Sequence, residues 1–80
     1  MIITVHNCKT NGKAYYVRMN RCELKTTHGI GLSRIDFMEI RRRGGRKALA
    51  RFEDKKWKTY DSRYWQDLHD TVGKMLEIFG

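Results

Sequence analysis

Residues 34–53 read RIDFMEIRRRGGRKALARFE, and the fold of the chain depends on whether this stretch forms a helix or a hairpin. Ser33, then Asp36 three residues later, and Gly44 after three arginines have the order of a capped helix. The apolar residues between them scatter around a helical wheel, however, and leave no clean apolar stripe. The capping pattern and the apolar pattern therefore disagree over residues 34–43.

A hairpin accounts better for the apolar residues of this stretch. With Gly44-Gly45 as the turn, Ile40 lies opposite Leu49 and Phe37 lies opposite Phe52. Large apolar pairs aligned across two strands stabilise a sheet. These two pairs favour strands on both sides of the glycines, with the helix over 34–43 as the alternative.

Downstream of the hairpin the sequence predicts a turn, a short strand and a long helix. Residues 53–56 form the turn and residues 57–60 the strand. Asp61 and Ser62 are both good N-caps, so the helix is predicted over 62–79. Its apolar residues recur at helical spacing and form one stripe, which we expect to pack on the sheet. The stripe consists of Trp65, Leu68, Val72, Met75, Leu76 and Phe79.

Upstream, residues 1–20 carry the strongest hairpin signal, Asn11-Gly12 between two segments rich in strand-forming residues. A two-residue turn there pairs Cys8 with Tyr15, His6 with Val17 and Thr4 with Met19. The face expected to be buried comprises Ile2, His6, Cys8, Tyr15, Val17 and Met19. Residues 21–27 can form a short third strand, and the glycines of 27–31 indicate a loop.

Together these elements predict one α+β domain over residues 1–80, an antiparallel sheet of three to five strands with the C-terminal amphipathic helix packed on one face. A chain of 80 residues is too short for two cores. Its 40% hydrophobic content argues against a disordered tail. We expect a cytoplasmic protein, because the chain has no apolar run of membrane-spanning length and no leader pattern in residues 1–6. Cys8 and Cys22 should then remain thiols.

The formal net charge is +8, and residues 41–58 alone hold nine basic and two acidic residues. Repulsion within so dense a cluster destabilises the folded chain unless water solvates the charges or an acidic partner neutralises them. The planar fork of arginine suits phosphate and the edge of guanine. We therefore expect nucleic acid as the partner, DNA first, and an acidic protein surface as the alternative. The candidate binding residues are Arg41, Arg42, Arg43, Arg46, Lys47, Arg51, Lys55, Lys56 and Lys58; Trp57 and Tyr60 alternate with the lysines and can stack on bases if they are exposed.

The stretches 41–48 and 57–61, followed by the terminal helix, resemble the AP2-type DNA-binding domain and the arm-binding domain of phage tyrosine recombinases. The resemblance covers residues 35–79 and is one of pattern, three basic antiparallel strands and then one helix. It implies a sheet that enters the major groove. Base or phosphate contacts would come from Arg41, Arg43, Arg46, Arg51 and Lys58. The N-terminal hairpin is additional to that fold.

Other constellations are weaker. His6, Cys8, Cys22 and His28 are zinc-ligating residue types, but their spacing fits no common site, so no metal or other cofactor is expected. His28 could serve as a base, as in small ribonuclease toxins, yet no carboxylate is placed beside it by the sequence. We expect a non-enzymatic accessory or regulatory protein, of the kind that phages and mobile elements encode. The alternative is an anti-CRISPR-like inhibitor that uses the same basic surface, with Trp57 or Tyr64 as its apolar anchor.

Overall fold

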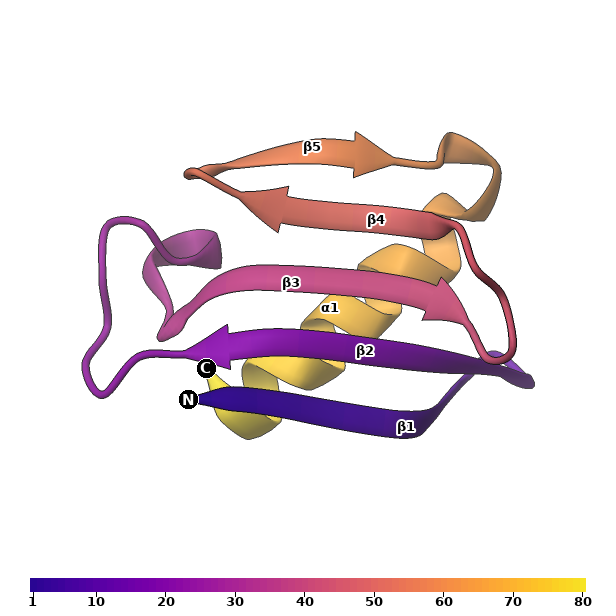
Figure 1. Cartoon of the computed structure of the whole chain (residues 1–80), viewed down its shortest axis with the longest axis horizontal. Helices are drawn as coiled ribbons and strands as arrows, with labels where there is room; N and C mark the ends of the chain where they lie inside the picture. The colour runs from indigo at the N-terminus through magenta and orange to yellow at the C-terminus, as the bar shows by residue number, and fades with distance from the viewer.

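The computed structural model describes all 80 residues, which form one five-stranded antiparallel sheet followed by one α-helix (Figure 1). The strands are β1 (Ile2–Thr10), β2 (Lys13–Arg21), β3 (Ile35–Arg42), β4 (Ala48–Glu53) and β5 (Lys56–Tyr60); two 3-10 turns, η1 (Ile30–Leu32) and η2 (Ser62–Tyr64), and the helix α1 (Trp65–Phe79) complete the chain. The strand order is β1-β2-β3-β4-β5, so every strand pairs with its neighbours in sequence. The predicted α+β class is confirmed, and residues 34–53 form a hairpin instead of a helix.

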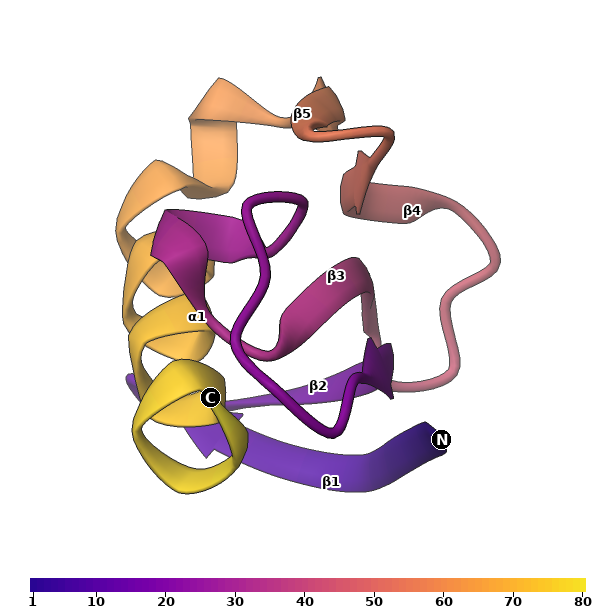
Figure 2. The same cartoon turned by 90° about the vertical axis from the view of Figure 1, so that its left-hand side faces the viewer.

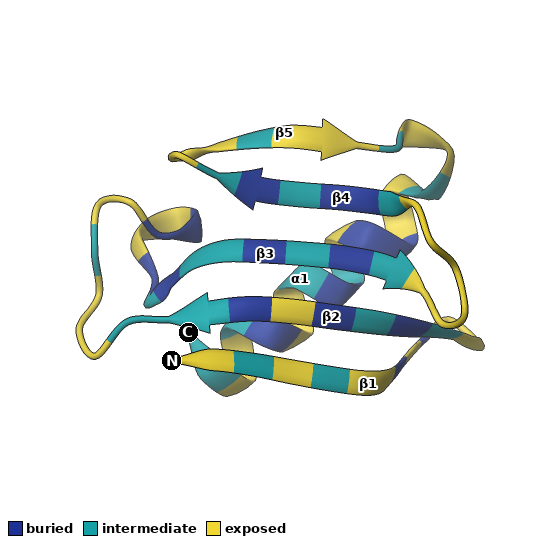
Figure 3. Cartoon of the chain, viewed as in Figure 1, coloured by how far each residue is buried: buried dark blue, intermediate teal, exposed yellow.

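The helix covers one face of the sheet and leaves the other face open (Figure 2). Buried residues alternate with less buried ones along β2 and β3, as Figure 3 shows, because alternate side chains point to opposite faces. Thirteen buried apolar residues form one cluster, in which Leu68 and Met75 of α1 meet the sheet. No helix in the structure is long and apolar enough to span a bilayer.

One member of the predicted helical stripe is not part of the core. Trp65 is 58% exposed, although Leu68 and Met75 of the same stripe are buried. Asp61 accepts a hydrogen bond from the backbone of Arg63, as an N-cap should, but the first turn is the separate element η2. Trp65 therefore opens α1 beside β5, the edge strand, where no further strand covers its indole.

The N-terminal hairpin turns at Asn11 and Gly12 as predicted, but its register slips partway along. Cys8 lies opposite Tyr15, whereas Val17 faces Val5 and not His6, and Thr4 pairs with Arg18 and not Met19. A bulge between Val5 and Cys8 accommodates the extra residue and reverses the alternation beyond it. The expected burial is therefore wrong for His6 and Ile2, which are exposed. Ile3 and Val5 pack on the core in their place.

The second hairpin also contains a bulge, between Ile40 and Arg41. Ile40 consequently lies opposite Ala50 and not Leu49, and Phe52 lies opposite Met38 and not Phe37. This shift of the register by one residue has a large consequence, because Phe37 and Phe52 then lie on opposite faces of the sheet. Phe37 is half-buried on the open face of the sheet.

The short third strand predicted over 21–27 is absent. Arg21 ends β2, and the following residues form a loop that returns to the start of β3. The amide of Cys22 donates to the carbonyl of Arg34 (2.7 Å), and that of Thr26 donates to Ser33 (3.1 Å). These bonds tie the loop to the residues just before β3.

A polar cluster fastens the β1–β2 hairpin to α1. Asp67 is buried and accepts hydrogen bonds from the hydroxyl of Tyr15 and from the amide of Asn11 (2.8 Å). The ammonium of Lys13 lies 3.3 Å from the same carboxylate. Burial and the neighbouring carboxylate raise the pKa of Tyr15 above its ordinary value, whereas hydrogen bonds from Tyr15 and Asn11 lower the pKa of Asp67. The early acidic residue of the helix therefore has a docking role as well as a favourable place in the helix dipole.

Candidate nucleic-acid interface

Four cations lie close together at the β3–β4 connection: Arg42 ends β3, and Arg43, Arg46 and Lys47 belong to the loop that follows. Gly44 has a φ of 80°, a conformation that favours glycine, and the amide of Gly45 donates to the carbonyl of Arg42 (2.8 Å). This tight turn leaves no long side chain at its tip. Arg42, Arg43, Arg46 and Lys47 are exposed and have no carboxylate within ion-pair distance. The structure therefore brings these four predicted residues together at one end of the sheet.

Two other predicted residues lie on the open face and are engaged within the chain. The Nε of Arg41 lies 3.9 Å from Oε1 of Glu39, and Nη1 of Arg51 lies 3.6 Å from Oε2 of the same carboxylate. Arg51 also lies 3.3 Å from Glu53. Glu39 sits on the central strand between them, so it neutralises part of the charge of this face.

The other three predicted lysines belong to the β4–β5 turn and to β5. Lys55 belongs to the β4–β5 turn and Lys56 begins β5, at the end opposite the β3–β4 loop (Figure 1). Lys58 lies 3.9 Å from the carboxylate of Asp54. The nine predicted residues therefore form three groups. The first has no ion pairs and lies at the β3–β4 loop, and the second, Arg41 and Arg51, is paired with carboxylates on the open face. The third consists of Lys55, Lys56 and Lys58.

Two aromatic rings on the open face were not among the predicted site residues. Tyr16 lies on β2 opposite Arg41, whose guanidinium stands 4.4 Å from the ring centroid. Phe37 lies on β3 with the guanidinium groups of Arg18 and Arg51 at 5.5 and 5.6 Å. Alternation along β2 places Tyr16 on the other face from buried Tyr15 and Val17, and alternation along β3 places Phe37 on the other face from buried Met38 and Ile40.

The aromatic residues proposed for stacking from the sequence lie on the other side of the sheet. Trp57 packs edge-on against Phe52 and against Tyr60, with ring centroids 5.2 Å apart in each pair. Trp57 also packs on the core, as does Tyr64. Trp57 and Tyr64 are only half-buried against the core, and their role as the apolar anchor of an inhibitor stays a prediction.

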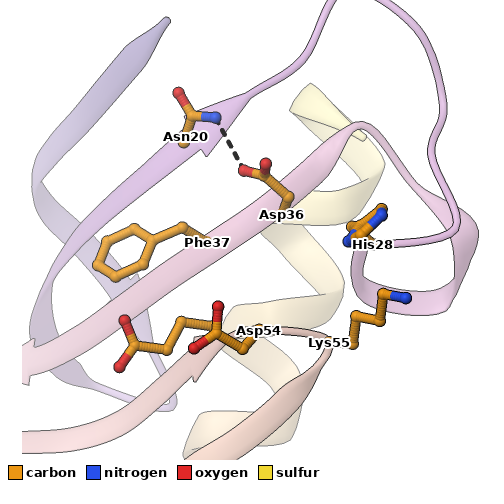
Figure 4. Close-up of a pocket in the computed structure, with 7 residues that line it drawn as sticks. Asn20, His28, Asp36, Phe37, Asp54 and Lys55 are labelled. Carbon is orange, nitrogen blue, oxygen red and sulfur yellow. Dashed lines mark hydrogen bonds between the residues drawn. The ribbon is translucent and has the colours of Figure 1, made fainter.

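His28 lines a polar pocket of about 310 Å³ at the lysine end of the open face. Its walls are Asn20, His28, Asp36, Phe37, Glu53, Asp54 and Lys55. Figure 4 shows His28 and Lys55 at one end and Phe37 at the other. The amide of Asn20 donates to Asp36 (2.8 Å), but the His28 imidazole makes no hydrogen bond or ion pair with these carboxylates. The fold thus brings carboxylates near His28 without orienting the imidazole as a base.

The cysteines and histidines considered for zinc do not gather in space. Both thiols are free, with Cys8 buried and Cys22 half-buried. Burial and a hydrogen bond to Asp36 raise the pKa of Cys22 above its ordinary value. No group of three or more histidine, cysteine or carboxylate side chains is arranged to hold a metal ion.

The strands β3, β4 and β5 and the helix α1 occur in the order that the AP2-type pattern requires, but β1 and β2 extend the same sheet. The resemblance remains a prediction. Neither a protein-family model, nor a curated protein, nor a solved structure matches the chain.

Proposed function

We propose that the protein binds nucleic acid without enzymatic activity, as a small cytoplasmic accessory or regulatory factor. The β3–β4 loop supports this proposal most, because four exposed cations there lack any carboxylate partner. Such a cluster repels itself until a polyanion neutralises it. The arginine forks of the loop match the spacing of phosphate oxygens, and the glycines let a backbone approach closely. Duplex DNA is the ligand that the AP2-type resemblance implies.

Replacing the two loop arginines should weaken binding and reduce its dependence on salt. We expect the variant Arg43→Ala/Arg46→Ala to bind about tenfold or more less tightly, since each charge-assisted hydrogen bond contributes about 1.5–3 kcal/mol. The slope of log affinity against log salt should fall by about two, one for each phosphate that an arginine no longer neutralises. Fluorescence anisotropy with a labelled DNA duplex and single strand, between about 50 and 200 mM salt, measures both quantities.

The matched control removes two charges from the lysine end of the sheet. Lys25 and Lys56 are exposed and form no ion pair, so Lys25→Ala/Lys56→Ala should change the affinity less than the loop variant. An equal reduction of affinity in both variants would assign binding to the overall field of the protein and not to the loop. Undetectable binding of wild type at the lower salt concentration would refute the proposal.

A second candidate function, an inhibitor that binds another protein with the same cations, gains support from one observation. Trp65 is 58% exposed, and a groove of about 550 Å³ lies between α1 and β5. Trp65 does not line the groove, but the hydroxyl of Tyr60, which does, donates to the carbonyl of Trp65 (3.4 Å). The groove is lined mainly by apolar side chains, among them Trp57, Tyr60, Val72 and Leu76. An exposed tryptophan beside an apolar groove has the composition of a binding hot spot.

The inhibitor function predicts that Trp65→Ala abolishes capture of a partner and leaves nucleic-acid affinity unchanged. We expect partner affinity to fall by about 30-fold or more, which corresponds to the 2 kcal/mol of a hot-spot residue. The measurement is a pull-down with immobilised wild type, Trp65→Ala and the loop variant. A protein captured equally by all three would bind through neither surface, and the inhibitor function would then be rejected.

A further inference from the structure

The width of the sheet limits how it can meet a nucleic acid. Neighbouring strands lie about 4.8 Å apart, so five strands form a surface about 19 Å wide. The major groove of B-DNA is about 12 Å wide and admits a helix or a two-stranded ribbon. The additional strands β1 and β2 therefore oppose insertion of the flat open face into a duplex groove. A single strand has no groove and can lie along this face.

Two aromatic rings are spaced along the open face. Tyr16 pairs with Arg41, and Phe37 lies four residues before Arg41 on β3, so the rings are about 13 Å apart along the strands. A stacked strand rises only about 3.4 Å per nucleotide. In a stacked strand, bases in contact with the two rings would therefore be separated by about three other nucleotides.

Planar guanidinium groups lie next to both aromatic rings on the open face. Arg41 covers Tyr16, and Arg18 and Arg51 flank Phe37. Glu39 holds Arg41 and Arg51 by ion pairs, which fixes their positions and neutralises part of their charge. Aromatic rings and guanidinium planes both stack on unpaired bases. The open face thus presents stacking groups, and four exposed cations without an ion pair lie at one end of it, at the β3–β4 loop.

We propose that the open face binds single-stranded nucleic acid, with unpaired bases stacked on the aromatic and guanidinium groups around Tyr16 and Phe37 and the phosphate backbone directed to the β3–β4 loop. This inference rests on the proposed function and specifies its ligand, an unpaired strand in place of a duplex. Charge complementarity supports this occupant, because the chain carries a net charge of +8. Every base has a flat face, so binding should show little sequence preference.

The test compares four labelled ligands with the wild-type protein by fluorescence anisotropy. They are a mixed-sequence DNA strand of about 12 nucleotides, the RNA of the same sequence, the corresponding DNA duplex, and a DNA strand of equal length with abasic sugars at its centre. The abasic strand keeps every phosphate and lacks the bases. Since one stacked base changes affinity by about 5- to 150-fold, the intact strand should bind at least about tenfold more tightly than the abasic strand and the duplex. The DNA and RNA arms show which sugar is preferred.

Phe37→Leu removes the ring and keeps an apolar side chain, so it should reduce affinity for the intact strand by about tenfold and leave the abasic strand unaffected. Tyr16→Leu should behave in the same way. The matched control is Tyr60→Leu, which removes a ring on the helix side and should change neither affinity. Circular dichroism and the melting temperature establish that each variant is folded.

The possible results separate this inference from the proposed function. Equal affinity for the intact and abasic strands, or tighter binding of the duplex, overturns the single-strand inference and leaves nucleic-acid binding standing. If Tyr60→Leu weakens binding as much as Phe37→Leu, the single-strand inference is likewise overturned and nucleic-acid binding stands. If none of the four ligands binds, the proposed function fails and the inference fails with it.

Discussion

Tyr15→Phe is expected to lower the free energy of unfolding by about 2 kcal/mol, because it removes a buried hydrogen bond to a carboxylate. Tyr15 is fully buried, and its hydroxyl donates to Oδ2 of Asp67. The variant leaves that oxygen with only the ammonium of Lys13 at 3.3 Å, while the phenyl ring still fills the core. Urea denaturation followed by circular dichroism measures the change.

Two further variants identify the origin of this destabilisation. Tyr64→Phe removes a hydroxyl that has no hydrogen-bond partner within the chain, so its effect should stay within about 0.5 kcal/mol. In a double-mutant cycle, Tyr15→Phe should cost much less when Asp67→Asn is already present. Additive effects in that cycle would show that the two side chains contribute independently, contrary to the geometry.

Acidification should destabilise the protein in the window from about pH 4 down to pH 2. Hydrogen bonds from Tyr15 and Asn11 lower the pKa of Asp67, and hydrogen bonds from Arg63 lower the pKa of Asp61 to about 2. The ordinary pKa of an aspartate is about 3.9, so below it the unfolded chain binds protons that the folded chain does not. The stabilisation is complete above that pH and is lost as the pH falls through the folded values. The urea midpoint should therefore decrease steeply between about pH 4 and pH 2.

Removing one of these carboxylates should flatten the profile. Asp67→Asn should be less stable than wild type at about pH 6 and should lose less of its remaining stability on acidification. Glu77→Gln, which removes one charge from the exposed side of α1, serves as the control and should follow the wild-type slope. An unchanged slope in Asp67→Asn would mean that the acid sensitivity arises elsewhere.

The elements of the fold were predictable because their signals are local. Asn11-Gly12 and Gly44-Gly45 mark turns whose conformations the residues themselves favour. The spacing of Leu68 and Met75 marks a helix that packs on a sheet. The registers were not predictable beyond the first few pairs. An extra residue in a strand changes the pairing without changing the composition, so the bulges in β1 and β4 were invisible.

In the candidate site, too, features that are local in the sequence were predictable and features that depend on strand pairing were not. The sequence identified the cations of the β3–β4 loop, since they are close together along the chain. It did not identify Glu39 as the partner of Arg41 and Arg51, or Phe37 as a residue of the open face. The pairing of Glu39 with Arg51 crosses from β3 to β4 and depends on a register that a single bulge alters. Phe37, Glu39 and Arg41 alternate along β3, so they share one face once the buried face of that strand is known.

The strand order has a consequence for the time course of folding. Every strand pairs with the next one in sequence, so the sheet can assemble by successive short loop closures, which are the fastest kind. The docking of α1 is different, because Tyr15 and Asp67 are 52 residues apart. On a ribosome, the hairpin of β1 and β2 therefore emerges and pairs before the helix that covers it has been synthesised, and its apolar face remains uncovered during that interval.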